Sequence, residues 1–196
     1  LVILQSIWFR NNWNWGHGNY EPQLKSSVNG VINIDHDSIP LKRLYSRDQN
    51  SIALFCNNET NPAKILNTVS TAKFFKDGIN DFLIQNNTNA INKDQCGPKA
   101  CFLIDTEIEA KESKIFEFRL SPHEMEDAFF NFDDIFSLRK AEANEFYSSI
   151  QREINDEEEK NVQRQAFAGL LWNKQFYHYN VSKWLKGDIK SENPRN

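Results

Sequence analysis

What this sequence lacks excludes several classes of function. No apolar run approaches the roughly 20 residues that a membrane-spanning helix needs, so no membrane partner is expected. The net charge of -4 gives no electrostatic reason to expect nucleic acid as a partner. Glycine-rich phosphate loops are missing, because Gly16-His17-Gly18 lacks the remainder of either nucleotide-binding pattern. The composition predicts a soluble globular protein.

Cysteine is scarce and its spacing is unlike that of a metal site. Cys56, Cys96 and Cys101 form an odd set without Cys-x-x-Cys spacing, and no histidine is near enough in sequence to complete a zinc pattern. No metal and no cofactor are therefore expected. Reduced thiols are the preferred interpretation, which favours a cytoplasmic location. A Cys96 to Cys101 disulfide across the Gly97-Pro98 turn is the alternative.

Residues 1–121 have the pattern of a β-rich domain. Short β-branched and aromatic runs alternate there with Asn, Gly, Pro and Asp, which favours strands joined by loops. The last two predicted strands resemble a hairpin, with the polar turn 109–113 between them. The predicted strands cover residues 1–9, 28–35, 51–57, 63–69, 81–85, 100–108 and 114–120.

After Ser121-Pro122 the apolar period becomes helical, so residues 122–196 are predicted to be a separate helical segment. One amphipathic helix is expected to start between residues 122 and 126 and to end near Glu153. A second is expected from about Lys160 to Tyr179. The acidic run 156–159 between them fits a solvated loop or a first helical turn. The expected buried residues of the second helix are Phe167, Leu170, Leu171 and Phe176.

The second helix carries the densest group of rings with polar tips in the chain. Helical spacing from Trp172 to Gln175, Phe176 and Tyr179 places a ring and hydrogen-bonding groups along one stripe. Such a stripe suits a polar ligand with apolar faces, such as a sugar. Among the histidines, His178 is the best candidate for a ligand contact because tyrosines flank it. The alternative is that these rings only pack the protein interior.

A second ring-rich run, residues 8–16, separates three tryptophans by Arg and Asn. These rings could stack on a carbohydrate or a nucleobase while the polar side chains hydrogen-bond to it. Alternatively, the tryptophans pack into a core or an interface and Arg10 pairs with a carboxylate. The adjacent acids of the chain are expected to be solvated, because proximity in sequence does not place two carboxyls across a glycosidic bond. They are Asp35 and Asp37, Asp133 and Asp134, and Glu142 and Glu145.

Several runs, taken in order, resemble a known family of enzymes. The most specific is Ala-Phe-Ala-Gly-Leu-Leu-Trp-Asn-Lys-Gln-Phe-Tyr-His-Tyr at residues 166–179. A second is residues 4–16, which contain Trp-Phe-Arg-Asn-Asn-Trp-Asn-Trp-Gly. The others are residues 76–81, 90–92, 97–100, 116–121, 132–136 and 139–143. Together they resemble glycoside hydrolase family 63, in the bacterial and fungal branch related to mannosylglycerate hydrolases and glucosidases.

The resemblance implies an α+β architecture. An antiparallel β-sandwich over residues 1–121, incomplete at its amino end, would be followed by residues 122–196 as the start of a catalytic (α/α) barrel of six helical hairpins. It also implies an inverting glycosidase, in which an aspartic acid protonates the leaving oxygen and a glutamate activates water. In the family both acids lie downstream of the segment matched here. No catalytic residue can therefore be assigned, and this chain is expected to be an inactive fragment of the enzyme.

The resemblance also implies one wall of a sugar site, with carbohydrate as substrate and the remaining barrel as partner. Asn180 stands where family members usually have Asp, which would weaken a contact to a neighbouring cation. The residues of this wall are Trp172, Lys174, Gln175, Tyr177 and His178.

Two other functions stay open from the sequence. One is a non-catalytic β-rich module that binds carbohydrate or another protein and docks through its helical tail. The other is a truncated product with a structural role. Continuation of the reading frame past Asn196 into further barrel helices would favour the enzyme.

Overall fold

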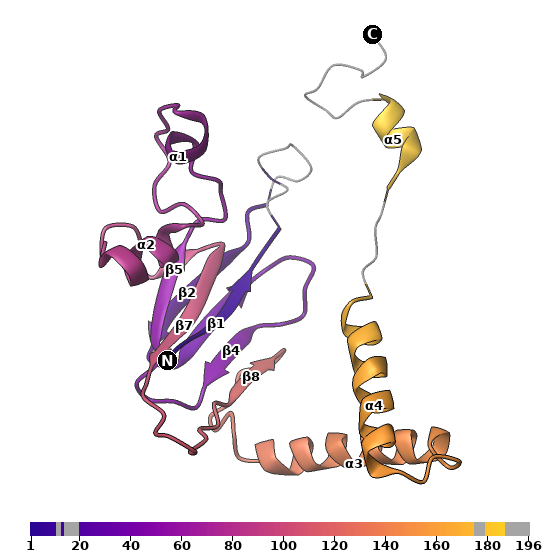
Figure 1. Cartoon of the computed structure of the whole chain (residues 1–196). Helices are drawn as coiled ribbons and strands as arrows, with labels where there is room; N and C mark the ends of the chain where they lie inside the picture. The colour runs from indigo at the N-terminus through magenta and orange to yellow at the C-terminus, as the bar shows by residue number, and fades with distance from the viewer. Residues whose placement is uncertain (11–12, 14–19, 175–178, 187–196) are drawn as a thin grey trace. The chain divides into compact units, whose positions relative to one another are not determined.

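The computed structural model describes residues 1–10, 13, 20–174 and 179–186. They form two compact units, Leu1–Ala128 and Phe129–Asn196 (Figure 1). The first unit contains antiparallel sheets with two short helices, and the second is helical. The chain is therefore of mixed α and β structure.

A three-stranded antiparallel sheet in the first unit has the order β1-β7-β5. It consists of β1 (Val2–Trp8), β7 (Lys99–Asp105) and β5 (Ile52–Cys56). The central strand β7 places Leu103 opposite Leu4 of β1, and Cys101 opposite Leu54 of β5. Side chains on both faces of β7 are buried, which means that other parts of the chain pack on both faces of this sheet.

A five-stranded antiparallel sheet in the same unit has the order β6-β2-β3-β4-β8. Its strands are β6 (Cys96–Gly97), β2 (Gln23–Val28), β3 (Val31–Asp35), β4 (Arg43–Ser46) and β8 (Phe118–Ser121). The chain crosses between the two sheets at Pro98, where β6 ends and β7 begins. Gly97 lies so close to β5 that an added Cβ would approach the Cys56 carbonyl oxygen to 2.7 Å, and its φ is +155°. Glycine therefore permits the crossing.

The two sheets enclose a common core. Alternate residues of β7, Ala100 and Phe102, face this core together with Phe55 of β5, and all three are fully buried. The five-stranded sheet contributes Leu24, Ile32, Ile34 and Leu44. Period-two alternation along each strand thus directs one set of side chains between the sheets.

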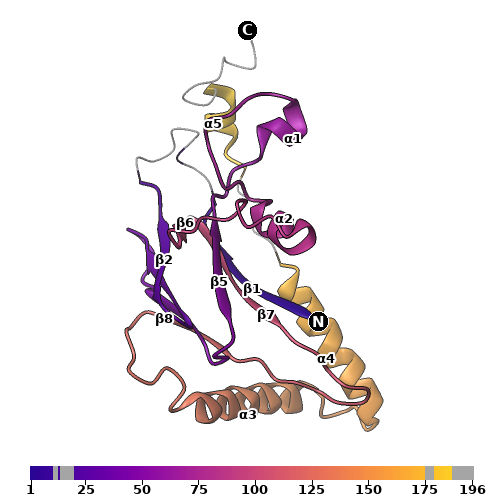
Figure 2. The same ribbon diagram turned by 90° about the vertical axis from the view of Figure 1, so that its left-hand side faces the viewer.

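The other face of the three-stranded sheet is covered by a helix, α2 (Gly78–Gln85). Figure 2 shows α2 beside β5, where Ile79 packs on Leu54 and Cys101 in a second apolar cluster. Phe82 and Leu83 follow Ile79 at three and four residues, so one side of the helix meets the sheet. The short helix α1 (Pro62–Leu66) precedes it, and the Asn61 side chain caps α1 by accepting hydrogen bonds from its first amides.

The second unit contains α3 (Phe132–Ile150), α4 (Glu157–Trp172) and α5 (Val181–Lys186). The Asp156 carboxylate begins α4 by accepting hydrogen bonds from the amides of Glu158 and Glu159, at 2.9 and 3.0 Å. The acidic run is thus the cap and first turn of a helix, as one of its two readings predicted. Neither α3 nor α4 has a buried residue.

The predicted strands at residues 1–9, 51–57 and 100–108 are confirmed by β1, β5 and β7. The predicted strands at 63–69 and 81–85 are wrong: residues 63–66 lie in α1, 67–69 lie in no strand, and 81–85 lie in α2. The Asn61-Pro62 start of α1 and the left-handed Asn86 that ends α2 outweigh the β-branched composition.

Other predictions also differ from the structure. The hairpin of residues 100–108 with 114–120 is wrong, since β7 and β8 lie in different sheets. The predicted strand 28–35 is interrupted at its start, because Asn29-Gly30 forms the turn between β2 and β3. The first long helix begins at Phe132 rather than near Pro122, and the second ends at Trp172 rather than Tyr179. None of the described helices has both the length and the apolar character of a membrane span.

Candidate functional site

The predicted sugar wall begins at the carboxyl end of α4. Trp172 is the last residue of this helix, and its side chain is 90% exposed. Asn173 ends the helix, with its backbone amide and its side-chain Nδ2 both donating to the Gly169 carbonyl oxygen, at 3.0 and 2.9 Å. Lys174 follows and is exposed. The described part of the wall is therefore a free indole ring with a lysine two residues beyond it.

Gln175, Tyr177 and His178 lie outside the described residues, so their placement in the wall stays a prediction. Beyond them, Asn180 precedes α5 and accepts a hydrogen bond on its backbone oxygen from the amide of Trp184, at 2.9 Å. The rings of Tyr179 and Trp184 lie 6.1 Å apart. The aromatic run thus continues into a further helical turn with its own ring pair.

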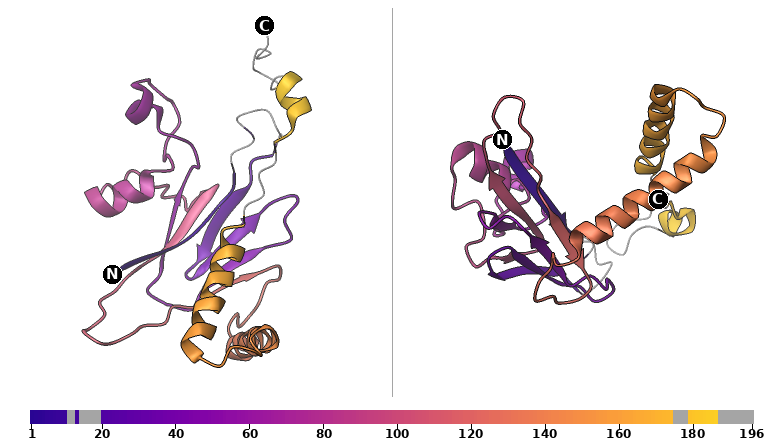
Figure 3. Two further views of the ribbon diagram at one scale, coloured as in Figure 1. Left: turned by 45° about the vertical axis from the view of Figure 1, so that its right-hand side comes forward. Right: turned by 90° about the horizontal axis from the view of Figure 1, so that it is seen from below.

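Apolar side chains along α3 and α4 are exposed. The expected burial of Phe167, Leu170 and Leu171 is wrong for this chain: Leu170 and Leu171 are each 70% exposed and Phe167 is 39% exposed. The physical reason is that the polar contacts between α3 and α4 lie near the connecting loop, from which the helices diverge (Figure 3). The exposed apolar residues are Ile135, Phe136, Leu138, Phe146, Ile150, Val162, Phe167, Leu170, Leu171 and Trp172.

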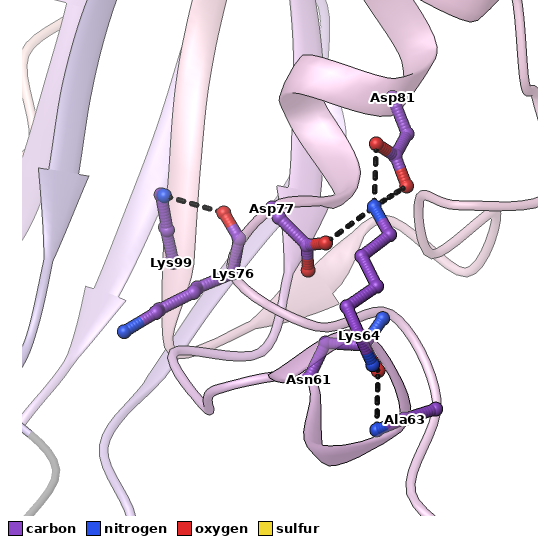
Figure 4. A network of polar contacts seen from close by, with 7 residues as sticks. All are labelled: Asn61, Ala63, Lys64, Lys76, Asp77, Asp81 and Lys99. Atoms are coloured by element: carbon purple, nitrogen blue, oxygen red, sulfur yellow. Dashed lines mark hydrogen bonds and ion pairs between the residues drawn. The ribbon is translucent and has the colours of Figure 1, made fainter. Parts of the chain in front are cut away.

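A cluster of charges in the first unit was not predicted. Figure 4 shows the Lys64 Nζ from α1 between Asp77 and Asp81 at the start of α2. It lies 2.6 Å from Asp77 Oδ2, and 2.8 and 2.6 Å from the two oxygens of Asp81. Asp81 is buried, with 8% of its surface exposed. Nothing in the sequence pattern indicated this contact, because the lysine and the acids lie on different elements.

The Lys64 ammonium compensates one of the two carboxylate charges of this cluster and contacts both acids. Burial raises the pKa of Asp77, but hydrogen bonds and the charge of Lys64 outweigh burial, so the pKa is lowered overall. Hydrogen bonds to Asp77 and Asp81 raise the pKa of Lys64. The contact therefore stabilises the fold at pH values between the lowered pKa of Asp77 and the raised pKa of Lys64. It loses strength as the pH falls through the lowered pKa of Asp77. Two acids already engaged by one lysine serve to fasten α1 to α2.

Three of the adjacent acids noted in the sequence make local contacts. Asp35 accepts a hydrogen bond from the Tyr20 hydroxyl at 2.8 Å, and Asp37 accepts one from Ser38 at 2.7 Å. Glu142 pairs with Arg139 one turn earlier on α3, at 3.0 Å. These contacts lie at the surface.

The tryptophan-rich run divides between the interior and the surface. Trp13 packs against the common core, as the structural alternative predicted, whereas Trp8 on β1 is 57% exposed. Trp15 lies outside the described residues. The register of β1 with β7 places Trp8, Leu4 and Val2 on the same sheet face as Leu103. An exposed apolar strip therefore runs along the edge strand β1.

All three cysteines are free, so the alternative of a Cys96 to Cys101 disulfide is wrong. Cys56 and Cys101 are buried beneath α2 in the second apolar cluster. Burial raises the pKa of the Cys56 thiol to about 11 and that of Cys101 to about 12. In the described part of the chain no group of three His, Cys, Asp or Glu side chains is placed to hold a metal ion.

Comparison with known proteins gives one relative of note. The chain is 32% identical over 164 residues to the Saccharomyces cerevisiae protein described as "Uncharacterized protein YMR196W". No family model and no solved structure matches the chain. The aligned region covers 76% of this chain and 15% of the yeast protein, so the chain corresponds to a small part of that much longer relative.

Proposed function

We propose that this chain is part of an inverting glycosidase of the family 63 type. In this proposal the sheets of the first unit form a β-sandwich domain, and α3 and α4 are the first helices of an (α/α) catalytic barrel. Trp172, Lys174, Gln175, Tyr177 and His178 contribute one wall of the sugar site. The acid and the base come from other helices of the barrel, and the substrate is a carbohydrate.

The observation that carries the proposal is the exposed Trp172 at the end of an unburied amphipathic helix. An indole ring stacks on the apolar face of a sugar, while nearby amide and ammonium groups can hydrogen-bond to its hydroxyls. The sequence around it is the run that resembles family 63 most specifically. Lys174 lies two residues away and is exposed, so it can reach the same ligand.

The exposed apolar side chains of α3 and α4 support the proposal of a barrel. A helix of 19 residues and one of 16 residues without a buried side chain do not form a stable core by themselves. Further helices packed on Phe136, Phe146 and Leu170 would bury these side chains, as in a barrel of helical hairpins. The yeast relative is several times longer than this chain, so it has room for such a domain.

The test is the substitution Trp172→Ala in the complete protein. Hydrolysis of a panel of α- and β-linked disaccharides is followed by proton NMR, which identifies the sugar anomer released first. Inversion is expected for the accepted linkage. Loss of the stacked ring is expected to lower kcat/KM about tenfold or more, with the melting temperature unchanged because the ring is exposed.

Trp8→Ala is the matched control, since it also removes an exposed indole but from β1 of the first unit. It should leave kcat/KM unchanged. Absence of hydrolysis across the panel, or an unchanged kcat/KM for Trp172→Ala, would reject the proposal.

The exposed strip on β1 favours a second candidate, a β-rich binding module. Val2, Leu4 and Trp8 present an apolar surface and an indole on one sheet face. If the first unit binds carbohydrate or protein there without catalysis, Trp8→Ala weakens binding and Trp172→Ala does not. The same pair of variants therefore separates the two functions.

A further inference from the structure

We propose that the junction of α3 and α4 is a binding site for a small oxyanion, the phosphate or carboxylate group of a metabolite. This site lies within the second unit and is independent of the proposed sugar wall. A cavity of about 520 Å³ opens there, lined by the last turns of α3, the connecting loop and the first turns of α4. Its volume lies within the range of small-molecule sites.

The lining of the cavity is polar and carries excess positive charge. Arg152, Lys160 and Arg164 line it, and Glu157 is the acid among the lining residues. Glu157 pairs with Lys160, whose Nζ lies 2.6 Å from its Oε1. In the described part of the chain no carboxylate pairs with Arg152 or Arg164. Two guanidinium charges therefore face the cavity without an anion to balance them.

The guanidinium of Arg164 is held in a fixed position. Its Nη1 donates to Asn144 Oδ1 of α3 at 2.7 Å, and its central carbon lies 4.6 Å from the centre of the Tyr147 ring. Of the five N–H donors of a guanidinium, this hydrogen bond uses one. The remaining donors form a fork that matches two oxygens of a phosphate or carboxylate. Because the guanidinium is already fixed, less side-chain entropy is lost when the anion binds.

The frame around Arg164 is also rigid. Gln151, which is buried at the end of α3, donates from Nε2 to the carbonyl oxygen of Lys160 at 2.8 Å. This bond joins the two helices across the loop, next to the contact of Arg164 with Asn144. The position of Arg164 thus depends on contacts inside the second unit, and Figure 3 shows α3 and α4 meeting at this end.

The test uses the 196-residue chain labelled with ¹⁵N, at a concentration below any self-association. Sodium phosphate and sodium malonate are titrated separately at constant ionic strength, with sodium chloride as the reference. Saturable amide shifts confined to residues 144–164 are expected, with a Kd of roughly 1–10 mM, which is typical of a single group on an open site. The phosphate and malonate arms show which oxyanion is preferred.

Arg164→Gln is expected to raise this Kd about fivefold or more, because a charge-assisted contact is lost. Arg152→Gln, at an exposed side chain whose loss leaves the helices intact, is expected to raise it about threefold. Arg139→Gln is the control, since it removes a cation from α3 outside the cavity, and it should leave the Kd unchanged. Shifts that chloride reproduces, or equal Kd values for all the variants, would overturn the site.

Discussion

The thiols of Cys56 and Cys101 are held in the apolar space between the three-stranded sheet and α2. Cys101 lies next to Cys56, whose charge would further raise its pKa. A thiolate is the reactive form of cysteine, so burial protects both side chains from alkylation and oxidation. Cys96 is half-buried at the crossing between the sheets, where Asn92 Nδ2 donates to its sulfur at 3.4 Å.

Alkylation of the folded chain should therefore distinguish the cysteines. With iodoacetamide at pH 8, one thiol per chain, Cys96, is expected to react fast, and Cys56 and Cys101 at least tenfold more slowly. Peptide mass spectrometry after a time course measures the labelling of each cysteine. Equal labelling of all three would contradict the packing beneath α2.

The raised pKa values of the buried thiols also make the free energy of unfolding depend on pH. Thiols of the unfolded chain ionise near pH 9.0, whereas the buried Cys56 thiol ionises near 11. The free energy of unfolding is therefore expected to fall as the pH rises from about 9 toward 11.

Among the elements, α1 and α2 show where sequence patterns are insufficient. The apolar, partly β-branched run at residues 1–9 predicted a strand, because such residues favour strands. The run Ala63–Val69 has β-branched residues, yet the cap at Asn61 followed by proline starts a helix there. Lys64 then reaches the acids of α2, a contact across 13 and 17 residues that no local pattern contains. The cap of α1 is a local signal that the sequence contains, whereas the contacts of Lys64 that join α1 to α2 form only in the folded chain.

Two helical glycines, one crowded and one open, are expected to respond in opposite ways to substitution by alanine. A Cβ on Gly78 would lie 2.2 Å from the Ala90 carbonyl oxygen, whereas a Cβ on Gly169 would have no neighbour within 4 Å. Gly78→Ala is expected to destabilise the first unit by about 1–3 kcal/mol through overpacking. Gly169→Ala should stabilise α4 by about 0.5–1 kcal/mol, because alanine favours a helix interior.

Hydrogen exchange read by mass spectrometry separates the two effects, since it reports each unit by its own peptides. Faster exchange in α2 and β5 is expected for Gly78→Ala, and slower exchange in α4 for Gly169→Ala. The close approach of the Ala90 backbone would be refuted by unchanged exchange in the first variant. In the complete protein, a loss of stability from Gly169→Ala would show that another segment packs against this glycine.

For the whole molecule, the helical unit differs from the sheet unit in what the sequence could predict. The apolar spacing predicted the helix that ends at Trp172. The exposure of Trp172 could not be predicted, because burial depends on which segments pack against the helix. The same holds for Leu170 and Leu171, whose apolar character indicated a core and which the structure leaves open. The cavity at Arg164 forms where two helices meet and has no signature along one helix.

The exposed apolar side chains of α3 and α4 should make the isolated chain self-associate. Apolar patches beyond a few hundred Å² are normally interfaces in soluble proteins. Sedimentation of the 196-residue chain is expected to depend on concentration. The double substitution Leu170→Glu and Leu171→Glu places charges at side chains that are 70% exposed. It should raise the dissociation constant about tenfold or more while leaving the helix content measured by circular dichroism unchanged.

A matched control separates this surface from apolar exposure in general. Ile65 and Leu66 on α1 are also adjacent aliphatic residues, 65% and 67% exposed, but they lie on the first unit. Their replacement by glutamate should leave the association unchanged if α3 and α4 form the interface. An equal effect of both pairs would mean that the chain associates through any exposed aliphatic group. A monomer at every concentration would mean that the apolar faces of α3 and α4 do not drive association. Association that only the α4 pair weakens would identify the helical face as an interface, as the proposed barrel requires.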